Sequence, residues 1–376
     1  MFLGYFFALF FVVGPLSPKP TSVRQRPEVA PAAPSPSEGL DVLSRVVAIG
    51  DVHGDLAALT AALRLGGLIG AAGETPAWRG GRTKCVVVGD MLDRGDEELQ
   101  VLNLLDVLRG EARFAGGSVT CLLGNHEVMN VCGDFRYTSH ASNKGFAALE
   151  AEVLQGLGGA WGAFADVPDA PKYPGLRIRA AAFAPGGLLA RRLSRFPVVA
   201  LIHGTLFVHA ALTVQALGGG GSNSDPLPLR AINRAAGAWL RGGDVNSSPM
   251  IPRALVGPES LVWSRQFGKP VGTQLAANDA ADLAAALAAV GARRMVVGHT
   301  PQASGGPGIN AAGPRGGGQC WRIDTGMAQT MGGKVEALEI TSFRSGKEAR
   351  VRVLTEGGVL EADQREAWSV SDGAFF

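Results

Sequence analysis

The amino-acid sequence predicts an α/β (α+β mixed) fold in which two packed mixed β-sheets are flanked by helices. From residue 44 onward, short β-branched apolar runs alternate with amphipathic stretches of helical length, a pattern typical of parallel βαβ units. Later in the chain, short strands are joined by glycine-rich turns, which indicates a second sheet of more antiparallel character. The chain has 376 residues, of which 46% are hydrophobic and 18% charged, so it can bury a large core.

The first sheet is predicted from three apolar runs of strand length, at Arg45–Ile49, Lys84–Val88 and Ser118–Leu123. Helical spacing of apolar residues predicts helices at Asp55–Leu65, Glu97–Arg109 and Gly145–Leu157. The second sheet is predicted from shorter runs, at Val198–Ile202, Leu206–His209, Arg294–Val297, Cys320–Asp324 and Val335–Thr341. Two more helices are expected at Leu229–Arg241 and Asp279–Val290. The segment Pro168–Pro197 has no clean period, and we expect it to cap the substrate side.

Both ends of the chain differ in composition from the middle. Met1–Val13 is almost wholly apolar but shorter than an ordinary transmembrane helix, so we interpret residues 1–17 as a signal-like or anchor-like segment. Residues 18–43, rich in Pro, Ser and Ala, are expected to form a disordered linker. A catalytic domain over 44–360 and a tail over 361–376 follow. This organisation predicts the secretory pathway or an organelle, such as the endoplasmic reticulum or a plastid, with membrane association through residues 1–13 if they are not cleaved.

Charge and cysteine content argue against two kinds of site. The formal net charge is +2 with histidine neutral, which is too small to favour a nucleic-acid partner. The four cysteines are widely spaced and form no Cys-x-x-Cys motif, so a thiolate zinc site is unsupported. Cys85, Cys121 and Cys320 lie in or beside predicted strands and are expected to be buried free thiols.

Five short motifs place polar side chains at or just beyond predicted strand ends. They are Gly50–Gly54, Gly89–Gly95, Gly124–Glu127, Phe207–His209 and Gly298–Thr300. In the first motif, Asp51 and His53 lie two residues apart, so in extended backbone both side chains point the same way and can reach one ion. Asp90 follows the neighbouring strand, where its carboxylate can bridge two ions roughly 3.5–4 Å apart.

Three further residues complete the predicted metal site. Asn125 offers a neutral carbonyl oxygen, and His209 and His299 each end a short apolar run. Either histidine alone would more often be structural, but four of the six histidines fall in these motifs, which favours a role as ligands. The predicted ligands are therefore Asp51, His53, Asp90, Asn125, His209 and His299. Their mixed oxygen and nitrogen donors favour two divalent metal ions, Mn, Fe or Zn, over calcium or magnesium.

The same motifs contain residues suited to phosphate binding and proton transfer. Arg94 can form a bidentate contact with phosphate oxygens, with a solvated ion pair to Asp93 or Glu97 as the alternative. His126 suits a general acid that protonates the leaving alkoxide, with Asp93 holding its ring. Arg265 is a second candidate for phosphate binding, or else it stacks on Trp263 at the surface.

These residues together predict a metal-dependent phosphomonoester hydrolase. A metal-bridging hydroxide would attack phosphorus in line, while Arg94 and the ions neutralise the equatorial oxygens. His126 would then protonate the leaving group. Glu127 is expected to support its turn rather than act in the chemistry.

The motifs resemble those of the phosphoprotein phosphatase superfamily of metallophosphatases. The family pattern GDxHG, GDxVDRG and GNHE corresponds to Gly50–Gly54, Gly89–Gly95 (with Leu92 in place of Val) and Gly124–Glu127, and two distal histidines follow. The resemblance implies the calcineurin-like metallophosphoesterase fold and a phosphorylated protein as substrate. It implies the same site residues, with one ion bound by Asp51 and His53, Asp90 as the bridge, and the other ion bound by Asn125, His209 and His299. Arg94 would grip phosphate and His126 would be the acid.

The sequence around the motifs is most similar to the Shewanella-like phosphatase branch. The stretches that carry this similarity are Asn125–Tyr137, Gly298–Gln302 and Arg322–Met327, and the resemblance extends over Val46–Ile340. The chain departs from the family where His209-Ala210-Ala211 replaces His-Gly-Gly, and two extra methyl groups there would crowd the backbone. Two alternatives remain open: a nucleotide or dinucleoside polyphosphate hydrolase of the same superfamily, and a pseudophosphatase binding module.

Overall fold

The computed structural model describes residues 42–157, 174–217, 229–243, 251–268, 275–302, 308–312, 319–344 and 349–361. The expected hydrophobic segment at 1–17, nearly all of the linker at 18–43 and the tail after residue 361 lie outside these ranges. None of the helices within the described ranges is long and apolar enough to cross a bilayer.

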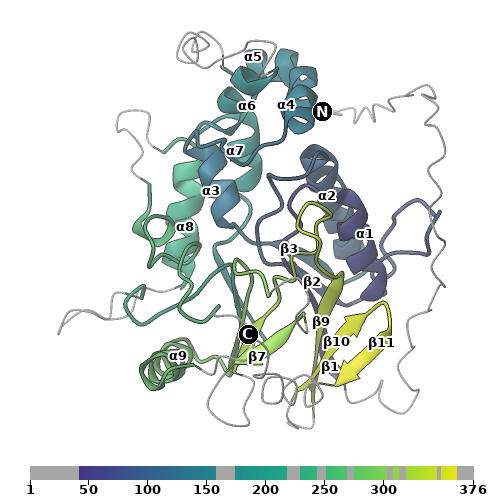
Figure 1. Ribbon diagram of the computed structural model, residues 1–376, viewed down its shortest axis with the longest axis vertical. Coiled ribbons are helices and arrows are strands. Elements are labelled where there is room, and N and C mark those ends of the chain that lie inside the picture. The colour runs from purple at the N-terminus through teal and green to yellow at the C-terminus, as the bar shows by residue number, and fades with distance from the viewer. Residues whose placement is uncertain are drawn as a thin grey trace, which may run out of the picture. The chain divides into compact units, whose positions relative to one another are not determined.

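The first sheet has six strands in the order β11-β10-β9-β1-β2-β3 (Figure 1). They are β1 (Val42–Ile49), β2 (Lys84–Val87), β3 (Ser118–Cys121), β9 (Glu336–Phe343), β10 (Arg350–Thr355) and β11 (Gly358–Glu361). β1, β2 and β3 pair in parallel, whereas β9, β10 and β11 join by antiparallel pairing. The three parallel strands therefore end at one edge of the sheet, as the alternation of strands and helices predicted.

The second sheet has five strands in the order β4-β5-β6-β8-β7. They are β4 (Val199–Ile202), β5 (Thr205–Val208), β6 (Arg294–Val297), β7 (Asn310–Ala312) and β8 (Cys320–Arg322). Both sheets are mixed, as predicted. The expected antiparallel character of the second sheet is wrong, because β5, β6 and β8 run parallel at its centre and only β4 and β7 pair antiparallel.

The strand predicted at Val335–Thr341 forms as β9, but it belongs to the first sheet and not the second. It pairs antiparallel with β1, for example at Val46 and Ile340. Seven of its eight residues are buried, and the buried Glu339 pairs with Arg45 of β1 and Arg352 of β10. Arg45 lies 294 positions away, so no local pattern could identify it as the neighbour. β10 and β11, which extend the sheet from β9, were not predicted.

The two sheets pack face to face. Alternate residues of β1 point to opposite faces, so Val46 and Ala48 enter the core between the sheets while Val47 packs toward the helices. Phe207 of β5 and Trp321 of β8 fill the same core from the second sheet. Burial on both faces explains why these strands are almost continuously apolar.

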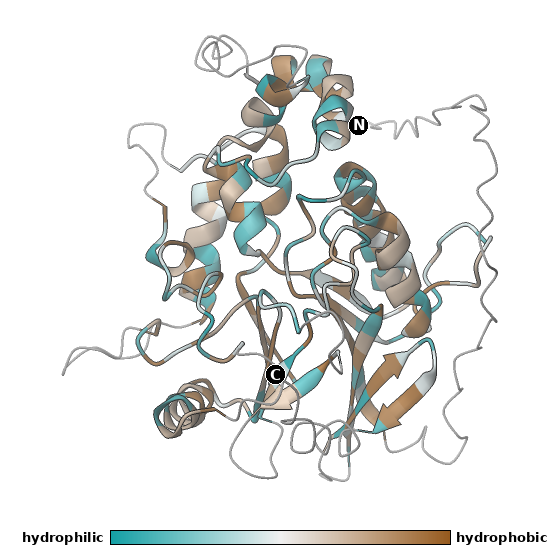
Figure 2. Cartoon of the chain, viewed as in Figure 1, coloured by the Kyte–Doolittle hydropathy of each residue, from teal (hydrophilic) through white to brown (hydrophobic). Residues whose placement is uncertain are grey.

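Helices α1 (Leu56–Leu65) and α2 (Glu98–Phe114) lie side by side on the outer face of the first sheet (Figure 1). Both carry hydrophobic and hydrophilic residues along their length (Figure 2). The Asp55 side chain caps α1 by accepting a hydrogen bond of 2.8 Å from the main-chain N–H of Ala58. α2 continues beyond its predicted end at Arg109.

The remaining helices are α3 (Asn125–Val131), α4 (His140–Phe146), η1 (Ala147–Leu149), α5 (Glu150–Leu157), α6 (Leu176–Phe183), α7 (Leu188–Leu193), α8 (Leu229–Leu240), η3 (Arg253–Leu255) and α9 (Ala277–Val290). α6 contacts α3, α4, α5 and α7, which forms a helical cap beside the strand ends. α6 and α7 lie in the segment that showed no helical period. Six of the eight residues of α6 are buried, so its sequence has no single apolar stripe.

Candidate metal centre

The structure brings the predicted ligands together from loops of both sheets. The segments after β1, β2, β3, β5 and β6 supply, in that order, Asp51 with His53, Asp90, Asn125, His209 and His299. Each of these residues is at most 6% exposed. Polar side chains buried together at strand ends need partners or ligands, because desolvation without them is costly.

One candidate metal-binding group consists of His53, Asp90 and His126, whose ligand atoms all lie within 4.8 Å of one another. Nδ1 of His53 lies 3.0 Å from the carbonyl oxygen of Leu92, which assigns the ring proton to Nδ1 and leaves Nε2 facing Asp90 at 3.9 Å. Burial lowers the pKa of His53 to about 4. The ring is therefore neutral near pH 7, as a metal ligand must be.

The second candidate group consists of Asp90, His209 and His299. Nδ1 of His209 lies 2.9 Å from the carbonyl oxygen of Val88, and Nε2 of His299 lies 3.0 Å from the carbonyl oxygen of Trp263. The other ring nitrogens, His209 Nε2 and His299 Nδ1, lie 3.0 and 2.8 Å from Asn125 Oδ1. Both rings are thus fixed from behind by main-chain carbonyls and directed at Asn125.

The arrangement around Asn125 fits a cation. The ring nitrogens of His209 and His299 and the amide oxygen of Asn125 converge on one buried point. Burial would lower the pKa of His209, but Asp90 raises it above its ordinary value, so positive charge is favoured here, either as a proton on that ring or as a cation in its place. Burial, and then the neighbouring His209, lowers the pKa of His299 to about 3, so that ring does not carry a second proton near neutral pH. The donor chemistry therefore fits a divalent metal ion.

Asp90 is shared by both groups. Its carboxylate lies 3.3 Å from His209 Nε2 and 3.9 Å from Nε2 of both His53 and His126. Burial would raise the pKa of Asp90, but the surrounding histidines hold that pKa well below its ordinary value. Asp90 is therefore an anion placed between the two groups, where a bridging ligand belongs.

Asp51 lies close to Asp90 but outside both groups of three. Its carboxylate accepts a hydrogen bond of 3.0 Å from the main-chain N–H of His299, and its side chain hydrogen-bonds Asp324. Burial and the neighbouring Asp324 raise the pKa of Asp51 well above its ordinary value. The premise of extended backbone at this motif is wrong, because φ at His53 is +49°, in the left-handed region. Asp51 as a ligand stays a prediction.

The loops of the site hold unusual backbone conformations. Six non-glycine residues in the described ranges have positive φ, and five of them belong to the site: His53, Asp90, Asp93, Arg94 and His299. Such conformations cost of order 1–3 kcal/mol each and persist where the surroundings impose them. Close approach also requires glycine, because a Cβ at Gly124 would lie 2.2 Å from a carboxylate oxygen of Asp90.

Glu127 imposes the conformation of the loop that carries Asp90. Its buried carboxylate accepts hydrogen bonds of 2.8 to 3.2 Å from four main-chain N–H groups, those of Gly124, Asp90, Met91 and Leu92. This confirms the prediction that Glu127 supports a turn.

His126 and Asp93 form a buried pair beside the first group. Nδ1 of His126 lies 2.6 Å from Oδ2 of Asp93, and Nε2 faces Asp90. Burial would lower the pKa of His126, but Asp90 and Asp93 raise it above its ordinary value. The ring can therefore hold a proton on the nitrogen that faces the metal groups, which is the arrangement that a general acid requires.

The two predicted phosphate-binding arginines contact different loops of the site. The guanidinium of Arg94 lies over the Tyr137 ring, 5.0 Å from its centroid, and its buried Nε has no hydrogen-bond partner. In the described ranges Arg94 pairs with neither Asp93 nor Glu97, so this donor is available to an anion. Arg265 is exposed, and its guanidinium lies 3.5 Å from the carbonyl oxygen of His299.

Several residues that contact the site were not predicted. Asp93 also binds Glu98, Asn130 and Arg179, which are all buried. Glu98 could have been suspected, because it is an acidic residue three positions beyond the Gly89–Gly95 motif. Arg179 gave no such signal, since it lies far along the chain in a helix whose apolar residues show no helical periodicity.

The alanines after His209 fit without strain. Ala210 and Ala211 are 1% and 0% exposed, and neither has a positive φ. The main-chain N–H of Ala210 donates a hydrogen bond of 2.9 Å to Leu261. The expected crowding is wrong, because the backbone here does not need glycine, and the pseudophosphatase alternative loses its main argument.

Comparisons with known proteins agree with this geometry. The calcineurin-like phosphoesterase family matches residues 44–302. Shewanella-like protein phosphatase 2 of Arabidopsis thaliana is 34% identical over 331 residues, which cover 83% of this chain and 77% of that protein. Shewanella-like protein phosphatase 1 of Plasmodium berghei is 39% identical over 95 residues, or 25% of each chain.

A solved structure has a similar fold. The cold-active protein-tyrosine phosphatase of a psychrophilic Shewanella species aligns with a TM-score of 0.59 at 21% identity, over 85% of this chain and 80% of that one. At this identity the likeness concerns the fold, and it confirms the predicted architecture. The chain belongs to the calcineurin-like metallophosphoesterases and, within them, to the Shewanella-like protein phosphatases.

Proposed function

We propose that this metal-dependent phosphatase removes phosphate from phosphorylated proteins. The observation that carries the proposal is the convergence of His209, His299 and Asn125, next to a carboxylate shared with a second group and a histidine able to hold a proton. The names of the similar proteins, which are protein phosphatases, support the choice of a phosphoprotein substrate.

The donor set favours Mn, Fe or Zn as the two divalent ions. Three imidazoles, from His53, His209 and His299, accompany the carboxylates of Asp90 and Asp51 and the amide of Asn125. Imidazole favours transition metals, whereas calcium and magnesium favour all-oxygen sites. When bound, such ions supply an acidified water and positive charge for the phosphoryl oxygens.

The protein's own residues bind phosphate and deliver a proton. Arg94 offers a buried guanidinium donor to the phosphoryl oxygens, and Arg265 offers a second guanidinium from the exposed side. Asp93 holds His126 so that Nε2 faces the centre, from which it can protonate the departing oxygen.

The substrate class can be tested with purified full-length chain loaded with manganese. We expect turnover of phosphopeptides, and a panel of phosphoserine, phosphothreonine and phosphotyrosine peptides will define the preference. Elemental analysis of the same sample should find two metal ions per chain. Strong cleavage of dinucleoside polyphosphates without phosphopeptide turnover would instead identify the nucleotide hydrolase alternative.

We expect Asp90→Asn to lose nearly all turnover and to bind less metal. The amide keeps the size of the side chain but removes the negative charge that both groups share. Metal content and p-nitrophenyl phosphate hydrolysis measure the two effects. Asp282→Asn, on α9, is the control for an aspartate outside the centre. Normal activity of Asp90→Asn would contradict the two-metal assignment.

We expect His126→Asn to keep its metal ions but to lower kcat by about 10²–10⁴-fold, the usual contribution of a general acid. The loss should be larger for phenyl phosphate than for p-nitrophenyl phosphate, since p-nitrophenolate leaves readily without a proton. Steady-state kinetics with both esters and elemental analysis provide the measurement. Loss of metal in this variant would show that His126 is a ligand and not the acid.

A further inference from the structure

A buried arginine connects the helical cap to the His126–Asp93 pair. Arg179 of α6 is 0% exposed. Its guanidinium donates to Asp93 Oδ1 at 3.0 Å, to both carboxylate oxygens of Glu98 at 2.6 and 2.8 Å, and to Asn130 Oδ1 at 2.7 Å. One side chain from the cap thus holds the loop after β2 and the first turn of α2 and contacts α3.

We propose that Arg179 is a positioning residue for proton delivery, acting through Asp93 on His126. This inference rests on the proposed role of His126 as the acid. It assigns to the helical cap a part in the chemical step, which goes beyond its expected place on the substrate side.

The hydrogen bonds of Asp93 explain how the effect is transmitted. Its Oδ1 accepts from Arg179 and Asn130, whereas Oδ2 is left for Nδ1 of His126. With each oxygen committed to different partners, the carboxylate cannot rotate, and the imidazole keeps the orientation in which Nε2 faces Asp90. Without Arg179, Asp93 would lose its strongest cationic partner on the side away from the ring.

The charges of the buried side chains support the same role for Arg179. Asp93 and Glu98 are two fully buried carboxylates, and Arg179 is the cation that pairs with both of them. Removing one member of a buried ionic group leaves an uncompensated charge in a low-dielectric region. The position of Asp93 beside His126 therefore depends on Arg179.

The geometry calls for a guanidinium and not merely a cation. Arg179 and Glu98 form a bidentate pair, and the rings of Phe146 and Phe183 lie 4.6 and 5.4 Å from the guanidinium carbon. A lysine ammonium could not make the same set of fixed, planar contacts. Lysine should therefore not fully replace arginine at this position.

The test compares esters whose leaving groups differ in their need for a proton. Arg179→Met should lower kcat for phenyl phosphate by at least about 10²-fold, with metal content unchanged. The loss of kcat for p-nitrophenyl phosphate should be several-fold smaller. The kcat of Arg179→Lys for phenyl phosphate should lie between that of Arg179→Met and that of the unmodified chain. In a double variant with Arg179→Met and His126→Asn, the two losses of kcat should not add, because both changes remove the same proton transfer.

Arg294→Met is the matched control, since Arg294 is buried at the opposite end of β6 from His299. It should change stability without changing the ratio of the two kcat values. If Arg179→Met does not fold, Arg179→Met with Glu98→Gln removes the unpaired charge and is measured in the same way.

Equal losses of kcat for both esters, or losses that add to those of His126→Asn, would overturn the inference. An unmodified chain with no phosphatase activity would instead overturn the proposed function.

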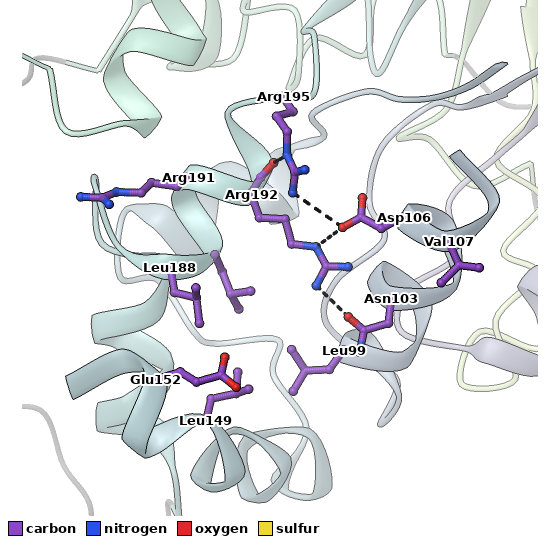
Figure 3. Close-up of a pocket in the computed structure, with 11 residues that line it drawn as sticks. Leu99, Asn103, Asp106, Val107, Leu149, Glu152, Leu188, Arg191, Arg192 and Arg195 are labelled. Carbon is purple, nitrogen blue, oxygen red and sulfur yellow. Dashed lines mark hydrogen bonds and ion pairs between the residues drawn. The ribbon is translucent and has the colours of Figure 1, made fainter. Parts of the chain in front are cut away.

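A second inference comes from a groove between α2, η1, α5 and α7, with a volume of about 800 Å³. Leu99, Leu149 and Leu188 line its apolar part, and Leu188 is 40% exposed. In Figure 3, Arg192 and Arg195 lie at one end and contact Asp106, while Arg191 points away from that pair.

The charges at that end leave an excess of positive charge. Asp106 is contacted by Arg109, Arg192 and Arg195 at 2.7, 2.8 and 3.7 Å, so its single negative charge is shared by three arginines. Arg191 makes no ion pair with the part of the chain that the structure describes. We propose that the groove binds a segment of a phosphorylated protein in which a leucine-like side chain is followed by acidic residues. The apolar side chain would contact Leu99 and Leu188, and the acidic residues would face the arginines.

The probe is a fluorescein-labelled peptide with one leucine followed by three glutamates, and its binding to the full chain is measured by anisotropy. Arg191→Glu with Arg195→Glu should weaken binding by about tenfold or more and leave kcat for p-nitrophenyl phosphate unchanged. Arg113→Glu, at an exposed position near the end of α2, should bind normally. Attaching the same sequence to a phosphopeptide should lower its KM.

Three outcomes would overturn this assignment. They are no saturable binding, equal binding by the double variant, and equal binding of a peptide in which lysines replace the glutamates. An inactive unmodified chain would count against the proposed function alone, because peptide binding is measured separately from turnover.

Discussion

The arrangement of the centre depends on one buried carboxylate. Asp90 faces His53 and His126 on one side and His209 on the other, and it remains ionised because these rings surround it. Its position is not a property of a strand alone, since its φ is +50° and its main-chain N–H is held by Glu127. Two groups from separate sheets can share an anion only because Glu127 fixes the loop between them.

The sequence could predict the meeting of the ligands because each follows an apolar run, and parallel strands that pack together end at the same edge. It could not predict the path of the backbone between those runs. The positive φ at His53 replaced the expected extended geometry and left Asp51 beside Asp324. β9 was placed in the wrong sheet for a related reason, because the contact that joins it to β1, between Glu339 and Arg45, links residues 294 positions apart.

Arg179 shows a different limit of sequence reasoning. Its proposed role rests on hydrogen bonds to residues between 36 and 86 positions away in the sequence. Neither the pattern of its helix nor the residues next to it predict these contacts. Arginine is rarely fully buried unless it is paired. The complete burial of Arg179 is explained only by the positions of Asp93 and Glu98 around it in the fold. If His126 acts as proposed, the cap helices serve partly to exclude water from the charged network that holds Asp93 and His126.

The buried polar centre and the left-handed loops have a common consequence. Both raise the free energy of the folded site, the first through the desolvation of carboxylates such as Asp51 and Asp90 and the second through backbone strain. A divalent ion would offset the desolvation and reinforce the loops that carry His53, Asp90 and His299. Because the unfolded chain has no preformed site, the ion binds the folded state preferentially, and part of its binding free energy stabilises the fold. The strain that evolution retained in these loops is thus compatible with a stable protein because the metal ions offset it.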